Sequence, residues 1–279
     1  MSETRGGALW PPRATRVPAS LAQRQLWLHA QGAPDVPLYN EPMTVHHKGL
    51  LNRAALEEAL NEVLRRHEAW RTTFISDGDD LFQVIHPLVP VRLPVVDLGR
   101  IPPEEREAEA LRLATEDARR PFDLERGPLL RATLVEFDDE HQRLYLTLHH
   151  MIFDGVSVYR VFLTELAALY EAFAVGRPSP LGEPPVQYVD FALHQRAWMN
   201  QAAAARQLAY WRRQLSQLPP PLALPTDKPR SARPTFRGAV QPVILPRPLV
   251  AALRALGHRE GVTLYMTLLA GLSTCVKRP

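Results

Sequence analysis

The chain has 279 residues, of which 46% are hydrophobic and 23% charged, and its formal net charge is +3. These values are ordinary for a globular protein, and they exclude the concentrated positive charge typical of nucleic-acid-binding proteins. The single cysteine, Cys275, excludes an internal disulfide framework and a Cys-rich metal site. We therefore expect a reducing, cytoplasmic setting, and we interpret Cys275 as a small core residue.

The amino-terminal residues 1–19 contain arginines and prolines but no apolar core, so we interpret them as a flexible segment and not as a signal peptide. The longest apolar run, residues 262–276, is interrupted by Thr and Ser. It is also shorter than the roughly 18 to 20 residues that a membrane helix needs. The sequence therefore predicts a soluble chain with neither a membrane nor a nucleic-acid partner.

Hydrophobic periodicity divides the chain into alternating strands and helices. Ser20 and Gln23 form a capping-box pattern, and Asn52 is expected to cap the second helix. The expected helices cover residues 21–28, 52–66, 103–120, 156–173, 186–215 and 249–276, the last broken at 257–261. Alternating apolar residues predict strands over residues 39–48, 70–74, 81–86, 91–96, 130–137 and 144–149. This succession is typical of the layered α+β class.

Proline marks the boundary between two parts of the chain. Nine prolines fall in residues 219–248, which predicts a long extended connection. Residues 20–218 form the larger part before this connection, and residues 249–279 form a helical part after it.

Residues 149–155 read His-His-Met-Ile-Phe-Asp-Gly, at the point where a predicted strand ends and a helix begins. Adjacent strand residues point to opposite faces, so only one of His149 and His150 can face a given cavity. A cleft-facing imidazole can accept a proton from a nucleophile or position it, whereas a structural histidine pair is the more common reading of the residues alone. Asp154 can hold backbone amides or a cation, and Gly155 permits a tight turn or a close approach to a ligand. No third ligand at metal-binding spacing is present, so no metal site is expected.

Several segments, in the same order, resemble motifs of the condensation domains of nonribosomal peptide synthetases. Residues 149–155 are similar to the His-His-x-x-x-Asp-Gly motif, which these domains share with chloramphenicol-acetyltransferase-like acyltransferases. Residues 20–27 resemble the opening motif of the family, and Tyr39-Asn40 follows them at a familiar distance. Residues 66–74 resemble the second motif, and residues 188–192 resemble the fourth. Residues 210–211 and 224–230 resemble the segment of the family that crosses to the second half. The resemblance covers essentially the whole chain after residue 19.

The resemblance implies a chloramphenicol-acetyltransferase-like fold, of which residues 20–218 would be the N-terminal half. His150 would be the catalytic histidine, acting on the acceptor amine as a general base or by orienting it. His149 and Asp154 would be architectural, and Gly155 would lie close to the reaction centre.

Other motif residues are expected to be structural. Arg71 and Glu68 are interpreted as structural or as a solvated ion pair, and Tyr188, Asp190 and Trp211 as packing and helix-register residues. The family fold also implies that the strands 39–48, 130–137 and 144–149 share one sheet. The helices 52–66 and 156–173 would cover one face of that sheet.

The implied function is amide-bond formation between a carrier-bound or CoA-bound acyl donor and a carrier-bound aminoacyl acceptor. No cofactor would be bound, because both substrates arrive on the phosphopantetheine arms of carrier domains, which are the expected partners. Three residues between His150 and Asp154 argue against the dual epimerising subtype, whose spacer is longer. Two alternatives stay open: a non-catalytic half-domain that binds carrier or partner proteins, and a stand-alone chloramphenicol-acetyltransferase-like acyltransferase.

The later motifs of the family's second half are not found in this sequence, so residues 249–279 are expected to be the start of a truncated second half. Asp154 would then lack its family arginine, and a partly buried, unpaired carboxylate either costs several kcal/mol or shifts its pKa until it is neutral. The isolated chain is accordingly expected to make no amide bond. It is also expected to expose an apolar patch that favours dimerisation, formed by Leu253, Leu256, Leu264, Leu268 and Leu269.

Overall fold

The computed structural model describes residues 15–218, 220, 226–229, 236 and 238–277, which fall into two units with a boundary between Arg213 and Gln214. The elements of the first unit, in chain order, are β1 (Thr15–Pro18), α1 (Leu21–Gln31), β2 (Asn40–Lys48), α2 (Arg53–Arg66), η1 (Glu68–Arg71), β3 (Thr72–Asp77), β4 (Asp80–Ile85), β5 (Val95–Asp97), α3 (Pro103–Arg119), β6 (Leu130–Asp138), β7 (His141–His149), η2 (Ser157–Phe162), α4 (Leu163–Phe173), α5 (Tyr188–Met199) and α6 (Ala202–Gln214). The second unit contains α7 (Arg247–Arg259) and α8 (Leu264–Lys277).

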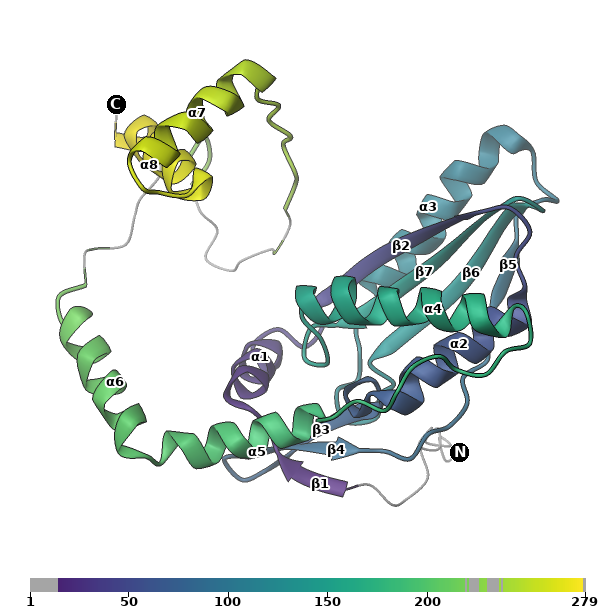
Figure 1. Cartoon of the computed structure of the whole chain (residues 1–279), viewed down its shortest axis with the longest axis horizontal. Helices are drawn as coiled ribbons and strands as arrows, with labels where there is room; N and C mark the ends of the chain where they lie inside the picture. The colour runs from purple at the N-terminus through teal and green to yellow at the C-terminus, as the bar shows by residue number, and fades with distance from the viewer. Residues whose placement is uncertain (1–14, 219, 221–225, 230–235, 237, 278–279) are drawn as a thin grey trace. The chain divides into compact units, whose positions relative to one another are not determined.

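A four-stranded sheet with the order β2-β7-β6-β5 forms the centre of the first unit (Figure 1). Its strands pair antiparallel except β5 and β6, which pair parallel. The helices α2 and α4 lie on one face, and α3 lies on the other. The expected sharing of one sheet by the strands near residues 39–48, 130–137 and 144–149 is confirmed.

Side-chain alternation explains why both faces of this sheet are covered. On β6, Leu134 belongs to the large core that includes α2 and α4, whereas its neighbour Val135 packs with Ala110 of α3. Neighbouring strand residues point to opposite faces, so the sheet needs a helical layer on each side to bury both sets.

A second sheet, β1-β4-β3, lies beside η1 and α5, and it corrects two predictions. Residues 15–18, which we assigned to the flexible segment, form β1 and pair antiparallel with β4. Residues 70–71, predicted as strand, belong to the 3-10 helix η1, and β3 begins only at Thr72. Residues 1–14 lie outside the described part.

The strand predicted over residues 91–96 forms only from Val95 onward, as β5. The backbone N–H groups just before it donate to side chains of α2 and not to a neighbouring strand. The Val91 N–H donates to Asn61 Oδ1 at 2.6 Å, and the Leu93 N–H donates to Glu57 Oε2 at 2.8 Å. Pro94 has no N–H to offer a neighbouring strand, so the ladder begins at Val95.

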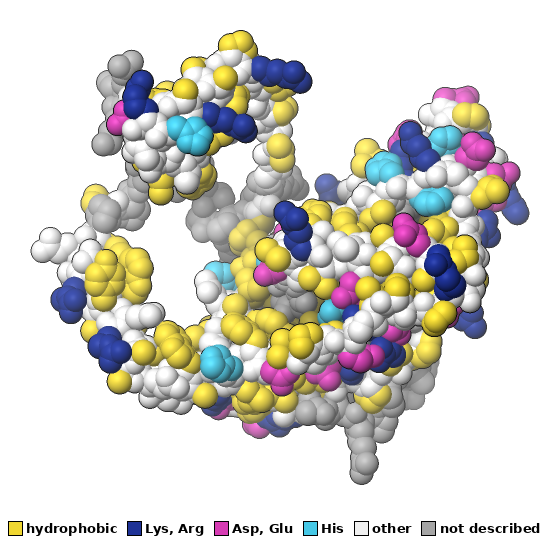
Figure 2. Space-filling model, in the orientation of Figure 1, with side chains coloured by type: hydrophobic (Ala, Val, Ile, Leu, Met, Phe, Trp, Pro, Cys, Tyr) yellow, Lys and Arg dark blue, Asp and Glu magenta, His cyan; other side chains and the backbone are white. Residues whose placement is uncertain are grey.

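The helix starts follow the sequence signals. Ser20 and Gln23 form both hydrogen bonds of the predicted capping box, and Asn52 Oδ1 accepts from the Ala55 N–H at 3.1 Å. The region 186–215 differs, because it forms two helices, α5 and α6, and not one continuous helix. Figure 2 shows hydrophobic side chains exposed along both helices. Trp211, which was expected to pack, is 56% exposed in the described part of the chain.

The second unit contains the predicted pair of helices. The break between them was predicted over residues 257–261, but α7 continues to Arg259 and α8 begins at Leu264. Gly257 lies inside α7, where a Cβ atom would come within 2.9 Å of the Val262 carbonyl oxygen, so glycine allows the close approach of the turn. Cys275 is exposed on α8, which corrects its interpretation as a core residue. The described residues between 219 and 246 form neither helix nor strand.

The five leucines predicted to form an exposed patch on this unit differ in exposure: Leu256, Leu268 and Leu269 are exposed, whereas Leu253 and Leu264 are half-buried. In the described part of the chain, no helix has the length and apolar character that crossing a bilayer requires.

Candidate functional site

The two histidines of the motif are fixed at the end of β7 by main-chain hydrogen bonds. β7 ends at His149, which lies opposite Asn40 of β2 in the antiparallel pairing of the two strands. The His150 N–H donates to the Tyr39 carbonyl oxygen at 2.9 Å, and the Ile152 N–H donates to the His149 carbonyl oxygen at 3.1 Å. The strand therefore holds the backbone of both histidines, and the chain turns immediately after them.

His150 faces a cavity of about 400 Å³. The lining is mainly apolar and comes from α1, η1, the motif loop and the start of α5: Ala22, Gln23, Leu26, His67, Ala69, Trp70, Thr72, Met151, Ile152, Phe153, Asp154, Ser157, Val161, Val186, Gln187 and Tyr188. The His150 ring stacks on the Phe153 ring, with 5.0 Å between the ring centroids. A cavity of this size and character is typical of a small-molecule site.

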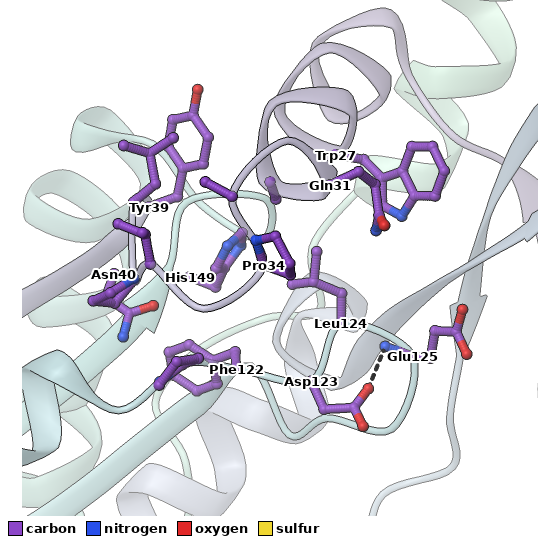
Figure 3. A pocket seen from close by; sticks show the side chains of 16 residues that line it. Trp27, Gln31, Pro34, Tyr39, Asn40, Phe122, Asp123, Leu124, Glu125 and His149 are labelled. Carbon is purple, nitrogen blue, oxygen red and sulfur yellow. Dashed lines mark hydrogen bonds between the residues drawn. The ribbon is translucent and has the colours of Figure 1, made fainter. Parts of the chain in front are cut away.

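His149 lines a different cavity, of about 210 Å³, between the end of α1 and residues 121–125 (Figure 3). Its side chain is 5% exposed and lies edge-on to the rings of Tyr39 and Phe122. Its Nδ1 accepts from the Met151 N–H at 3.3 Å. Burial, and secondarily the neighbouring His150, lower the pKa of His149 to about 4, so the ring is neutral at pH 7.

The placement of the two histidines agrees with the strand alternation. The cavity beside His149 was not expected, because the sequence indicated only that this side chain turns away from the one that faces His150.

Asp154 is exposed and its pKa is lowered, whereas the sequence predicted a partly buried carboxylate that is either neutral or costly to bury. Its Oδ1 accepts from the Ser157 N–H at 2.7 Å, and its own N–H donates to Ser157 Oγ at 2.8 Å. The bond from the Ser157 backbone is the largest influence on the pKa of Asp154, which is lowered although burial opposes it. The carboxylate is exposed to solvent and makes no ion pair with a described residue. Solvation and amide donors thus keep it charged without an arginine.

Gly155 carries no conformational requirement in this structure. Nothing lies within 4 Å of the position that a Cβ atom would take there. Its expected closeness to the reaction centre is compatible with its place beside Asp154, but no described contact depends on glycine.

Three residues that we predicted to be structural, Arg71, Asp190 and Tyr188, make hydrogen bonds in the first unit. Arg71 donates to the His86 carbonyl oxygen and lies 3.6 Å from Glu68, and burial lowers the pKa of its guanidinium. Asp190 caps the start of α5 by accepting from the Gln187 N–H at 2.8 Å. Tyr188 hydroxyl is 2.8 Å from Ser20 Oγ and joins α5 to α1.

Sequence reasoning missed three of the residues that line the His150 cavity. His67 and Trp70 lie in the second motif, and Phe153 occupies a variable position of the His-His motif. The motif matches could have indicated the first two, but no pattern in the sequence places their side chains beside His150. Only the fold brings η1 against the motif loop.

A buried ion-pair network supports this edge of the cavity. Arg66, whose side chain is 4% exposed, donates to Glu165 at 3.0 Å and to the Gly182 carbonyl oxygen at 2.7 Å. His67 Nε2 lies 2.8 Å from the same Glu165 carboxylate. The network connects α2 to α4 and fixes the side chain of His67.

Comparison with known proteins identifies the family. The sequence model of the protein family described as "Condensation domain" matches residues 13–278. The chain belongs to the condensation-domain family. It is 43% identical over 267 residues to chondramide synthase cmdD of Chondromyces crocatus. The match covers 96% of this chain and 7% of that protein. It is 39% identical to phosphinothricin tripeptide synthetase PhsC of Streptomyces viridochromogenes, covering 94% of the chain and 24% of that protein.

Solved structures show the same fold. The X-domain from teicoplanin biosynthesis superposes with a TM-score of 0.78 and 29% identity, over 91% of this chain and 55% of that one. The starter condensation domain of rhizomide synthetase RzmA superposes with a TM-score of 0.67 and 26% identity, over 74% of this chain and 49% of that one. The chain thus spans about half the length of these solved domains and a small part of the curated synthetases. The predicted α+β class and condensation-domain fold are confirmed.

In the described residues, no group of three or more His, Cys, Asp or Glu side chains is arranged to hold a metal ion.

Proposed function

We propose that this chain contributes the catalytic histidine of an amide-forming condensation reaction, in which the amine of a carrier-bound aminoacyl group attacks a carrier-bound or CoA-bound acyl thioester. The observation that carries the proposal is the position of His150. It stands at a strand end, faces a cavity of about 400 Å³, and receives no side-chain hydrogen bond from a described residue. Its ring nitrogens are therefore available to a substrate.

The chemistry needs no cofactor. The amine nitrogen attacks the thioester carbonyl carbon, a C–N bond forms, and the C–S bond breaks as the tetrahedral intermediate collapses. The amine loses one proton, and the departing thiolate gains one. His150 accepts the proton from the amine or holds the amine through a hydrogen bond.

The partners follow from this reaction. Phosphopantetheine arms of carrier domains would deliver both thioesters, which suits a cavity that is open to solvent and mainly apolar. The relatives named as synthases and synthetases support the assignment to carrier-dependent peptide synthesis. A structure of the RzmA starter domain in complex with C8-CoA and Leu-SNAC supports the substrate classes. We also propose a cytoplasmic location, in keeping with the single cysteine.

The test is a turnover assay with an acyl-loaded donor carrier and an aminoacyl-loaded acceptor carrier, with the acceptor product measured by intact-protein mass spectrometry. One arm contains the 279-residue chain alone. The other adds the second half of a related condensation domain as a separate polypeptide. The control is His141→Ala, at the exposed opposite end of the strand that ends at His149.

We expect turnover in at least one arm, with His150→Ala slower by about 100-fold or more and His141→Ala unchanged. Equal rates for the wild type and His150→Ala would contradict the proposal. If carriers bind in calorimetry but no amide forms in either arm, the chain is a carrier-binding module without catalytic activity.

A further inference from the structure

We infer that Phe153 is a positioning residue that sets the plane of the His150 imidazole through a stack of three rings. This inference rests on the proposed function of His150. It concerns the residue between Ile152 and Asp154, a position that the motif leaves open.

The imidazole of His150 is half-buried and has an aromatic ring as its neighbour. The main chain of His150 is held by its hydrogen bond to Tyr39, but this bond leaves the side-chain torsions free. The His150 ring stacks on the Phe153 ring, with centroids 5.0 Å apart and planes inclined by 20°. Rotation of the imidazole out of this plane would break the stack.

Phe153 is in turn aligned by Trp70. The two rings are inclined by 22°, with centroids 6.4 Å apart, so Phe153 is close to parallel with both His150 and Trp70. Phe153 itself is half-buried and lines the cavity.

Trp70 is anchored in the hydrophobic core. Its side chain is 5% exposed and meets the fully buried ring of Phe162 edge-on, at 5.0 Å between centroids and an interplanar angle of 63°. Phe162 ends the π-helix η2, which follows directly after the motif loop. Such π-helical turns are found frequently at functional sites. The core thus fixes Trp70, Trp70 aligns Phe153, and Phe153 aligns His150.

The stack also suits the charge that His150 would acquire. If the imidazole accepts the amine proton, the resulting cation lies over the face of an aromatic ring, which attracts cations through its quadrupole. An aliphatic side chain of similar size would fill the space but would supply neither this attraction nor a flat surface.

The test compares Phe153→Leu with Phe153→Tyr, which keeps the ring. Phe82→Leu is the matched control, because Phe82 is also half-buried and stacks with a cationic group, Arg16, but lies on β4. We expect Phe153→Leu to lower kcat by about 10-fold with little change in KM, as a loss of alignment does. Phe82→Leu should retain the wild-type kcat, and Phe153→Tyr should restore most of the kcat that Phe153→Leu loses, because it keeps the ring.

A second readout does not depend on turnover. In histidine-labelled protein, NMR should show the His150 ring protons displaced upfield by the Phe153 ring. The displacement should vanish in Phe153→Leu and remain in Phe153→Tyr, with circular dichroism confirming that each variant is folded.

Retention of the wild-type kcat in Phe153→Leu, while His150→Ala is inactive, would overturn the inference and leave the proposed function intact. Full activity of His150→Ala would instead refute the proposed function. An unchanged His150 NMR signal in Phe153→Leu would refute the stack in either case.

Discussion

The neutral, buried His149 should make folding stability fall in mild acid. In the folded chain its pKa is lowered to about 4, against an ordinary value of 6.5 that we take for the unfolded chain. Below pH 6.5 the unfolded chain binds a proton that the folded chain does not, which favours unfolding. The stability contributed by neutral His149 is therefore complete above pH 6.5, falls with decreasing pH, and stops falling near pH 4.

The size of the effect follows from the two pKa values. A shift from 6.5 to about 4 corresponds to about 3 kcal/mol in all, at about 1.4 kcal/mol for each pH unit. Between pH 7 and pH 5 the binding equilibria give a loss of about 2 kcal/mol from this one group. A difference of that size is a large part of the stability of an ordinary domain.

The assay is urea unfolding at pH 7 and pH 5 for the wild type, His149→Asn and His141→Asn. An asparagine at position 149 can still accept the Met151 N–H but does not titrate, so its stability should fall by about 2 kcal/mol less than that of the wild type. His141→Asn, on the exposed end of the same strand, should keep the wild-type pH dependence. Equal losses in the wild type and His149→Asn would refute this account of His149.

Three other substitutions, one of them with a control, test contacts that stabilise the first unit. Glu165→Gln leaves the buried Arg66 without its countercharge and should lower the free energy of unfolding in urea by about 2 to 3 kcal/mol. The control, Glu116→Gln, weakens an exposed ion pair on α3 and should lower it by less than about 0.5 kcal/mol. Similar costs for the two would contradict the buried network. Asn52→Ala removes the cap of α2 and should lower the unfolding free energy by about 1 kcal/mol. Tyr188→Phe removes the hydrogen bond between α5 and α1 and should lower the unfolding free energy by about 1 kcal/mol. Amide hydrogen exchange at the start of α5 should become faster, and unchanged exchange would show that this bond does not hold α5 in place.

Local patterns predicted much of the fold. The capping box of Ser20 and the strand alternation in β6 and β7 depend on residues a few positions apart, so the sequence alone indicated them correctly. The 3-10 turn of η1 and the irregular backbone before β5 were missed. In the second case, the backbone N–H groups of Val91 and Leu93 donate to Asn61 and Glu57, about thirty residues away along the chain, and no local sequence pattern predicts such bonds.

The site divides in the same way. Alternation along β7 predicted that His149 and His150 face different sides. It did not predict the ring stack on His150, because Trp70 and Phe153 are brought together by the packing of η1 against the motif loop. The expectation of partial burial for Asp154 was wrong for a related reason: its exposure to solvent and its hydrogen bond from the Ser157 amide are properties of the folded loop.

The most direct measurement of the central claim is to find which side chain a carrier-type substrate reaches. A pantetheine derivative bearing a chloroacetyl group can alkylate a nearby nucleophilic ring nitrogen, and peptide mass spectrometry then identifies the modified residue. The account predicts alkylation of His150, which lines the larger cavity, and protection of that residue by an excess of aminoacyl-pantetheine. Modification of His149 or His67 in its place, or a His150 that stays unmodified, would contradict the claim that substrates meet at His150.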